Sequence, residues 1–118
     1  MNYVKVRNVT RGVELGQKVR VASSLVERAV GLLRTPVLGP GEGLWISPCT
    51  SIHTFFMRYP IDALFLDSGG VVLSGQTLGP WRLSGWHWKS RGVLELSAGI
   101  LHQTGTQPGD HLEIKDVL

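Results

Sequence analysis

Residues 49–67 of the chain read CTSIHTFFMRYPIDALFLD and place a thiol, an imidazole, a thioether, a guanidinium and two carboxylates among apolar and aromatic side chains. Polar groups in such a stretch are costly to bury unless they find hydrogen-bonding partners. The stretch therefore either builds a functional site or ties a small core together. Its second part, residues 61–66, leads into the turn sequence DSGG and the apolar residues 71–73, which predicts a β-hairpin closed by a glycine turn.

Short strands are expected on both sides of this hairpin. Alternating valines predict strands over residues 4–9 and 18–22, and apolar runs predict others at 44–46, 93–96 and 111–114. The alternation of aromatic and apolar residues across 54–59 predicts a further strand, apolar on both faces and interrupted by Pro60.

One segment carries a clear helix signal. Ser24 followed three residues later by Glu27 is a capping-box pattern. An apolar stripe at helical spacing follows, made of Leu25, Ala29, Leu32 and Leu33, and Pro36 is expected to end the segment. A single helical turn is predicted over 98–104, stopped by Gly105.

Length and turn content then indicate the architecture. A chain of 118 residues fits one domain, spanning 1–118, and its fifteen glycines and six prolines are typical of many turns between short strands. We expect a mainly β fold: a compact antiparallel sandwich, jelly-roll-like, or a partly open barrel, with one short α-helix and one helical turn.

Composition narrows the class of protein. Apolar residues make up 42% of the chain, and the one cysteine excludes an internal disulfide. The N-terminal sequence has no apolar core typical of a signal peptide, and no apolar run is long enough to span a membrane, so a cytoplasmic protein is expected. The net charge of +3 comes without a dense basic run, which makes nucleic acid an unlikely partner.

Cys49 and His53 are the first candidates for chemistry, because an imidazole can activate a thiol. They would meet only if residues 49–53 formed a helical turn, since four residues of extended strand span ~13 Å. Together with Met57 they could instead bind a soft metal such as Cu(I). The favoured interpretation is a buried cysteine and a histidine bonded to backbone, with no metal and no cofactor.

Three carboxylates receive separate interpretations. Asp62 lies inside an apolar strand, so it should be buried and need a cation or several donors, with Arg28, Arg34 and Arg58 as candidate ion-pair partners. An anion-binding or acid–base role is the alternative. Asp67 is expected to start the hairpin turn, and Glu95, between Leu94 and Leu96, is expected to be solvated.

The segment PWRLSGWHWKSR at 80–91 combines tryptophans with cations. If the segment is extended, Trp86 and Trp88 share a face with Lys89 opposite, and neighbouring Arg82, Lys89 and Arg91 complete an aromatic and basic patch. Such a patch can stack sugars or bases or bind a protein partner. Rings that cover the core are an equally ordinary interpretation.

Several blocks of the sequence together resemble a known family. They are Glu27-Arg28 with GLLR at 31–34, EGL at 42–44, FFMRYPID and FLDSGG within 55–70, VLELSAG at 93–99 and PGD at 108–110. Their order and spacing resemble the family called domain of unknown function 192. The resemblance implies a small, mainly β, jelly-roll-like domain and no accepted activity, cofactor or catalytic residue. Other relatives carry a Trp-Met-Lys-Asn type of sequence in place of Cys49 and His53, so these two are not expected to be indispensable.

The sequence favours a small β module that binds a ligand or a protein partner. Its rivals are a small enzyme that uses Cys49 with His53 or a buried Asp62, and a structural accessory domain. The candidate binding residues are Cys49, His53, Met57, Arg58, Asp62, Trp86 and Trp88.

Overall fold

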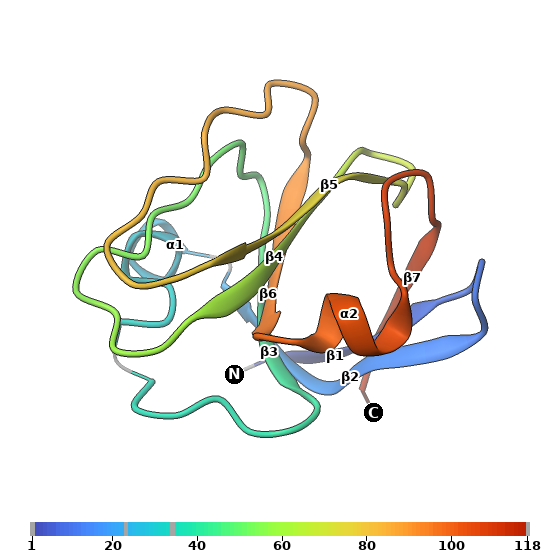
Figure 1. Cartoon of the computed structure of the whole chain (residues 1–118), viewed down its shortest axis with the longest axis horizontal. Coiled ribbons are helices and arrows are strands. Elements are labelled where there is room, and N and C mark those ends of the chain that lie inside the picture. Colours follow the sequence, from blue (N-terminus) through green and yellow to red (C-terminus); the bar gives the residue numbers. More distant parts are fainter. Residues whose placement is uncertain (1, 23, 34, 118) are drawn as a thin grey trace.

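Seven strands hydrogen-bond side by side into one curled sheet (Figure 1). In their order across the sheet they are β5 (Val72–Leu78), β4 (Ile61–Leu66), β6 (Gly92–Ser97), β3 (Glu42–Ile46), β2 (Val13–Ala22), β1 (Tyr3–Asn8) and β7 (Leu112–Asp116). Neighbouring strands are antiparallel except β2 and β3, which run parallel. The computed structural model describes residues 2–22, 24–33 and 35–117. The predicted mainly β fold is confirmed, and the curled sheet corresponds to the partly open barrel.

The β4–β5 hairpin forms where the turn sequence predicted it. Oδ1 of Asp67 accepts hydrogen bonds from the backbone N–H groups of Gly69 and Val71, each 2.9 Å long. Gly70 has φ 83°, and a Cβ there would lie 2.7 Å from the carbonyl oxygen of Leu112. The turn therefore requires glycine at this position for both its conformation and its close contact with β7.

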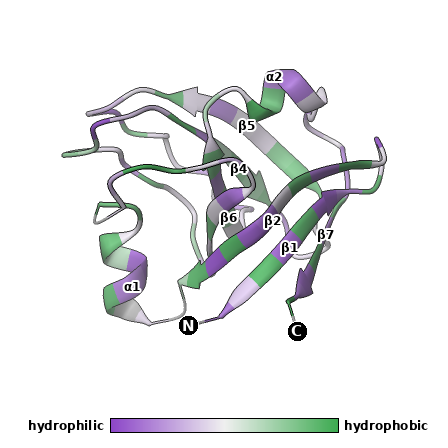
Figure 2. Ribbon diagram, turned by 90° about the horizontal axis from the view of Figure 1, so that it is seen from below, coloured by the Kyte–Doolittle hydropathy of each residue, from purple (hydrophilic) through white to green (hydrophobic). Residues whose placement is uncertain are grey.

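The sheet carries a hydrophobic core on each of its two faces. Successive residues of a strand point to opposite sides, so Phe65 of β4 packs in one cluster while Leu64 and Leu66 pack in the other. In β6, Val93 belongs to the first cluster and Leu94 and Leu96 to the second. Figure 2 shows the corresponding alternation of polar and apolar residues on the outer strands. β4 and β6 are therefore buried on both faces.

The two helices are short. The capping box of α1 (Leu25–Val30) is present, since Ser24 Oγ accepts from the Glu27 N–H at 3.0 Å and Glu27 Oε1 accepts from the Ser24 N–H at 3.3 Å. The helix ends at Val30, earlier than expected from Pro36, because Gly31 turns the chain away with φ 54°. The predicted helical turn before Gly105 is α2 (Ile100–Thr104). Arg34 lies outside the described residues.

The strand predicted over 54–59 is absent, and this prediction is wrong. Phe56 has φ 68°, and the N–H of Met57 donates to the carbonyl of Thr54 at 3.1 Å, so the chain turns instead of extending. Residues 47–60 and 79–91 form two irregular loops that hydrogen-bond to each other, with one antiparallel bridge between His53 and Leu83. In Figure 1 these loops lie beside α1, on the side of the molecule away from β7.

None of the helices among the described residues is long and apolar enough to cross a membrane.

Candidate binding site

A pocket of about 180 Å³ lies between α1 and the loop of residues 47–60. Its walls are mainly apolar and include Leu32, Ile46, Ile52, Met57 and Ile61. Its polar lining comes from Arg28, Cys49, Ser51, His53 and Glu95. Apolar walls with a few converging polar groups are typical of small-molecule sites.

Glu95 reaches the pocket from β6, an inner strand of the sheet. It lies opposite Leu44 of β3 and Ala63 of β4, and it projects to the same face as Val93, two residues earlier. The residue is only 5% exposed. The prediction that Glu95 is solvated is therefore wrong, because β6 has strands on both sides and a core on both faces.

The Glu95 carboxylate has no hydrogen bond or ion pair with any described residue. Every fully enclosed side-chain oxygen of the described residues has a hydrogen-bond partner. Because the Glu95 carboxylate has none, it is not fully enclosed and keeps access to the pocket that it lines. Burial raises the pKa of Glu95 to about 7, although the positive charge of Arg20 acts in the opposite direction. Near neutral pH the pocket thus holds an acid that takes up or releases a proton readily.

Cys49 and His53 line this pocket without bonding to each other. The Cys49 thiol donates to the Ser51 carbonyl at 3.1 Å, and Nδ1 of the exposed His53 accepts from the Phe55 N–H at 3.2 Å. Burial raises the pKa of Cys49 and the charge of Glu95 raises it further, whereas donation from the Ser51 backbone to the thiolate and the charge of Arg28 act in the opposite direction. Residues 49–53 form no helical turn. The arrangement is unlike a thiolate–imidazolium pair.

Met57 and Arg58, which follow on the same loop, differ in placement. Met57 is buried and packs in the core beneath the pocket. Arg58 is exposed and lines a neighbouring pocket of about 320 Å³ together with Phe56 and Tyr59. No group of three or more His, Cys, Asp or Glu side chains with metal-binding geometry occurs in the part of the chain that the structure describes.

Asp62 is fully buried, as predicted, but it lies away from this pocket lining. Its Oδ1 accepts from the Thr77 hydroxyl at 2.6 Å, and its Oδ2 accepts from the N–H groups of Gly99 at 3.0 Å and Leu101 at 2.9 Å. These donors replace the predicted arginine, since neither Arg28 nor Arg58 pairs with it. The contacts make Asp62 a structural residue that holds the start of α2 against the sheet.

Trp86 and Trp88 are exposed by 75% and 68%, so the interpretation of these rings as core residues is wrong. Between them His87 points inward, with its ring centroid 4.0 Å from that of Phe65. The His87 N–H donates to the Thr50 carbonyl at 2.8 Å, which fixes residues 79–91 to the facing loop. Both tryptophan side chains therefore face outward, and Lys89 Nζ lies 5.1 Å from the Trp88 ring centroid.

Fold and pocket together define a small curled-sheet β protein whose interior opens beside a short helix. The chain belongs to the DUF192 family, described as "Uncharacterized ACR", whose model matches residues 6–114.

Relatives agree with this membership, and two solved structures have a similar fold. A UPF0127 protein of Pyrococcus furiosus is 33% identical, over 90% of this chain and 94% of its own length, and one of Pyrococcus abyssi is 32% identical, over 90% and 93%. The crystal structure of a Sinorhizobium meliloti protein, described as a candidate transcription regulator, is similar with a TM-score of 0.78 and 25% identity, covering 95% of this chain and 92% of that one. A Novosphingobium aromaticivorans protein of unknown function has the same fold, with a TM-score of 0.80, 22% identity and coverage of 94% and 83%.

Proposed function

We propose that the chain is a binding protein for a small, mainly apolar molecule that ends in a hydrogen-bond donor. The observation that carries the proposal is the buried, unpartnered Glu95 carboxylate in the lining of a mainly apolar pocket. A buried carboxylate without donors is destabilising, and a donor from a ligand would compensate for this cost.

The dimensions of the pocket limit the ligand. A cavity of roughly 150 Å³ can hold benzene, so 180 Å³ has room for a short branched chain and a head group. Ile46, Ile52 and Ile61 supply apolar contact for the chain. An ammonium head fits Glu95 best, because its positive charge favours the ionised carboxylate and supplies several N–H donors.

The enzyme alternative receives less support. A nucleophilic cysteine needs a lowered pKa and a base within hydrogen-bonding reach. In this chain burial raises the pKa of Cys49, and its thiol donates to a backbone carbonyl. We therefore interpret Cys49 and His53 as parts of the pocket lining.

The proposal is tested by nuclear magnetic resonance titration with 3-methylbutylamine as the probe and 3-methylbutanol as its neutral counterpart. Saturable shift changes for the amine are expected around residues 28–33 and at Ile46, Ile52 and Glu95. The substitution Glu95→Gln should lower the affinity for the amine by about tenfold or more and should lower the affinity for the alcohol far less.

A matched pair of variants on α1 provides the control. Ala29 lines the pocket and is exposed, whereas Val26 is exposed on the same helix and is absent from the lining. Ala29→Trp should block binding and Val26→Trp should leave it unchanged. The proposal would be refuted if the chemical shifts did not saturate with either probe. It would also be refuted if Ala29→Trp and Val26→Trp bound the amine equally well.

A further inference from the structure

The two loops that flank the pocket expose an unusual number of large apolar side chains. We define the loop surface as residues 53–58 and 79–91. Five residues on it are exposed by more than half, namely Phe56, Trp81, Leu83, Trp86 and Trp88. Exposed aromatic residues gathered in adjoining segments indicate an interaction surface rather than the scattered apolar residues of ordinary protein exteriors.

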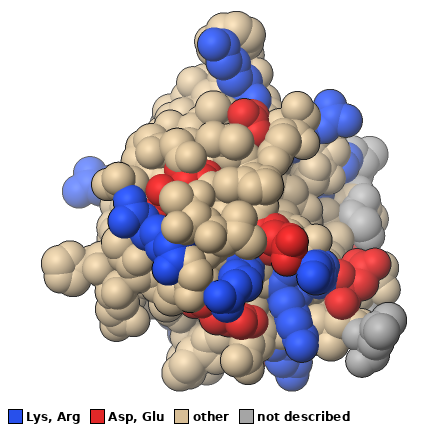
Figure 3. Space-filling model, turned by 90° about the vertical axis from the view of Figure 1, so that its right-hand side faces the viewer, with Lys and Arg blue, Asp and Glu red and all other residues tan. Residues whose placement is uncertain are grey.

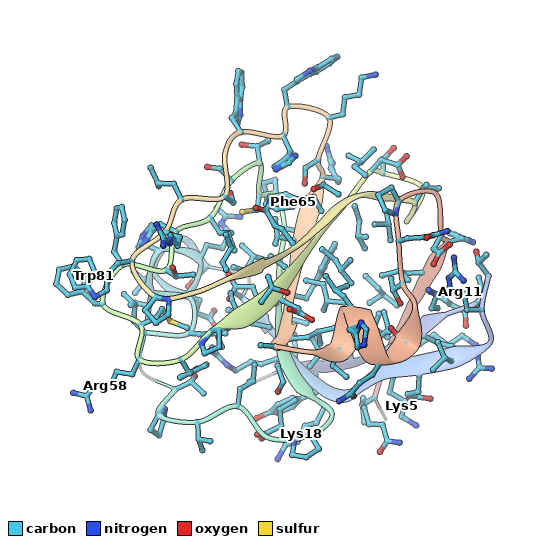
Figure 4. The ribbon with its side chains drawn as sticks, in the orientation of Figure 1. Lys5, Arg11, Lys18, Arg58, Phe65 and Trp81 are labelled. Carbon is cyan, nitrogen blue, oxygen red and sulfur yellow. The ribbon has the colours of Figure 1, made fainter. Side chains whose placement is uncertain are left out.

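The aromatic tip of this surface is built into the fold. Phe56 and Trp81 have φ of 68° and 63°, a conformation that aromatic residues rarely adopt, and their ring centroids lie 4.5 Å apart. Figure 4 shows Trp81 pointing away from the body of the protein. The strain is held by surrounding contacts, which is typical of functional positions.

Buried Thr54 fixes this tip from below. Its hydroxyl donates to the Gly79 carbonyl at 2.6 Å and accepts from the Arg82 N–H at 2.9 Å. Its backbone N–H donates to the Arg82 carbonyl at 2.9 Å, and its carbonyl accepts from the Trp81 N–H at 2.9 Å. Backbone groups at the base of the tip are therefore paired, so the rings can enter an apolar medium without exposing these groups to it.

All Lys, Arg, Asp and Glu side chains of the loop surface are positively charged. The loop surface, residues 53–58 and 79–91, contains four cations, Arg58, Arg82, Lys89 and Arg91, and no acidic residue. The rest of the chain has eight cations and nine acids. Figure 3 shows that acidic and basic side chains are mixed on the β7 side. Figure 4 shows Arg58 extending outward on the same side of the molecule as Trp81. The surface therefore matches an anionic partner.

From these observations we infer that the loop surface docks on an anionic lipid bilayer, with Phe56 and Trp81 entering the interface and the four cations contacting lipid headgroups. Tryptophan is enriched at the membrane interface, and basic residues beside it are attracted by anionic lipids. This docking is separate from ligand binding in the pocket and does not depend on it.

The geometry favours lipid over other anionic partners. Single-stranded nucleic acid binds through free ring faces along a groove, whereas Phe56 and Trp81 pack against each other and Lys89 Nζ lies 5.1 Å from the Trp88 ring centroid. A protein partner would need a surface whose shape matches each of the protruding rings. A fluid bilayer accommodates such rings without a matched shape.

The test is co-sedimentation with vesicles of phosphatidylcholine mixed with phosphatidylserine, compared with vesicles of phosphatidylcholine alone. The wild-type chain should bind the mixed vesicles at low salt and lose affinity as salt is added. Phe56→Gly combined with Trp81→Gly removes both rings and suits the positive φ, so this variant should fold, as a thermal melt can verify. Its affinity should fall by at least about tenfold.

The control combines Val9→Ser with Val117→Ser, which removes two exposed apolar side chains next to β1 and β7, on the side of the molecule away from the loop surface, and should leave vesicle binding unchanged. Absence of binding to the mixed vesicles, equal binding to phosphatidylcholine alone, or equal binding by the glycine variant would overturn the inference. It would also be overturned if a single-stranded oligonucleotide displaced the vesicles, or if sedimentation velocity showed a dimer that the glycine variant abolishes.

Discussion

Asp62 and Leu101 are 39 residues apart in sequence and are joined by a hydrogen bond of 2.9 Å from the Leu101 N–H to Oδ2 of Asp62. The same oxygen accepts from Gly99 at 3.0 Å, so one buried carboxylate satisfies two backbone donors at the start of α2. This helix has no side-chain cap of its own, since its N-cap residue is Gly99. Asp62 therefore replaces the missing cap from a neighbouring strand.

Replacing Asp62 should be costly. Asp62→Ala leaves the donors of Gly99 and Leu101 without a partner, and we expect the free energy of unfolding to fall by about 3 kcal/mol. Thr77→Val removes only the third donor and should cost about 1 kcal/mol. Urea denaturation measures both changes. An unchanged midpoint for Asp62→Ala would show that the carboxylate is solvated.

Glu95 should make stability depend on pH. Its folded pKa of about 7 lies above the ordinary value of 4.5, so the folded state holds the proton more tightly than the unfolded state does. The stability that Glu95 contributes is therefore complete below about pH 4.5, declines as pH rises and is lost above about pH 7. Between these two pH limits the contribution of Glu95 to the free energy of unfolding changes by about 3 kcal/mol.

Glu95→Gln should remove this dependence, because glutamine stays neutral. The variant should gain stability relative to the wild-type chain between about pH 5 and about pH 8. Denaturant unfolding across that range measures the difference. Parallel pH profiles for the two chains would contradict the burial of an unpartnered carboxylate.

Cys49 should behave as an unreactive thiol. Burial raises its pKa, so little thiolate is present at neutral pH and alkylation by iodoacetamide should be slow in the folded state. His53→Ala should leave the rate unchanged, because His53 bonds to Phe55 rather than to the thiol. Rapid labelling near about pH 6 that disappears in His53→Ala would instead support a catalytic pair.

Trp86 and Trp88 should be dispensable for folding. Because both side chains are largely exposed, Trp86→Ala and Trp88→Ala should each change the free energy of unfolding by less than about 0.5 kcal/mol. Phe65→Ala, in the core below His87, should cost about 3–5 kcal/mol and serves as the contrast. Strong destabilisation by either tryptophan substitution would place that ring in the core.

Local sequence signals predicted local structure well. The DSGG turn of the β4–β5 hairpin and the capping box of α1 depend on residues within a few positions of one another, and both form as predicted. The family resemblance implied a small, mainly β domain, and this is confirmed. The end of α1 was misplaced because Gly31 breaks the helix before Pro36 is reached.

The other errors concern contacts between distant segments. Residues 54–59 alternate like a strand, but buried Thr54 bonds to Gly79, Trp81 and Arg82, which are at least 25 positions away, and the chain turns at Phe56. The alternation of apolar and polar residues around Glu95 predicts a strand with one solvent-exposed face. Its burial follows from the inner position of β6 between β4 and β3, which depends on the order of strands in the whole sheet.

The candidate site was found only in part for the same reason. Cys49, His53 and Met57 line the pocket as neighbours in sequence, whereas the group that gives the pocket its chemistry, Glu95, comes from a strand far along the chain. The available signal is an acidic residue between two leucines, a pattern that by itself predicts a solvated position on a strand.

The central claim is that the Glu95 carboxylate is the polar end of a ligand pocket. The most direct test follows its carboxyl ¹³C resonance through a pH titration, with and without 3-methylbutylamine. The free protein should show a midpoint of about 7, and saturating amine should lower it by about one pH unit or more, because a bound ammonium favours the ionised form. A midpoint near 4.5, or one that the amine leaves unchanged, would contradict the claim.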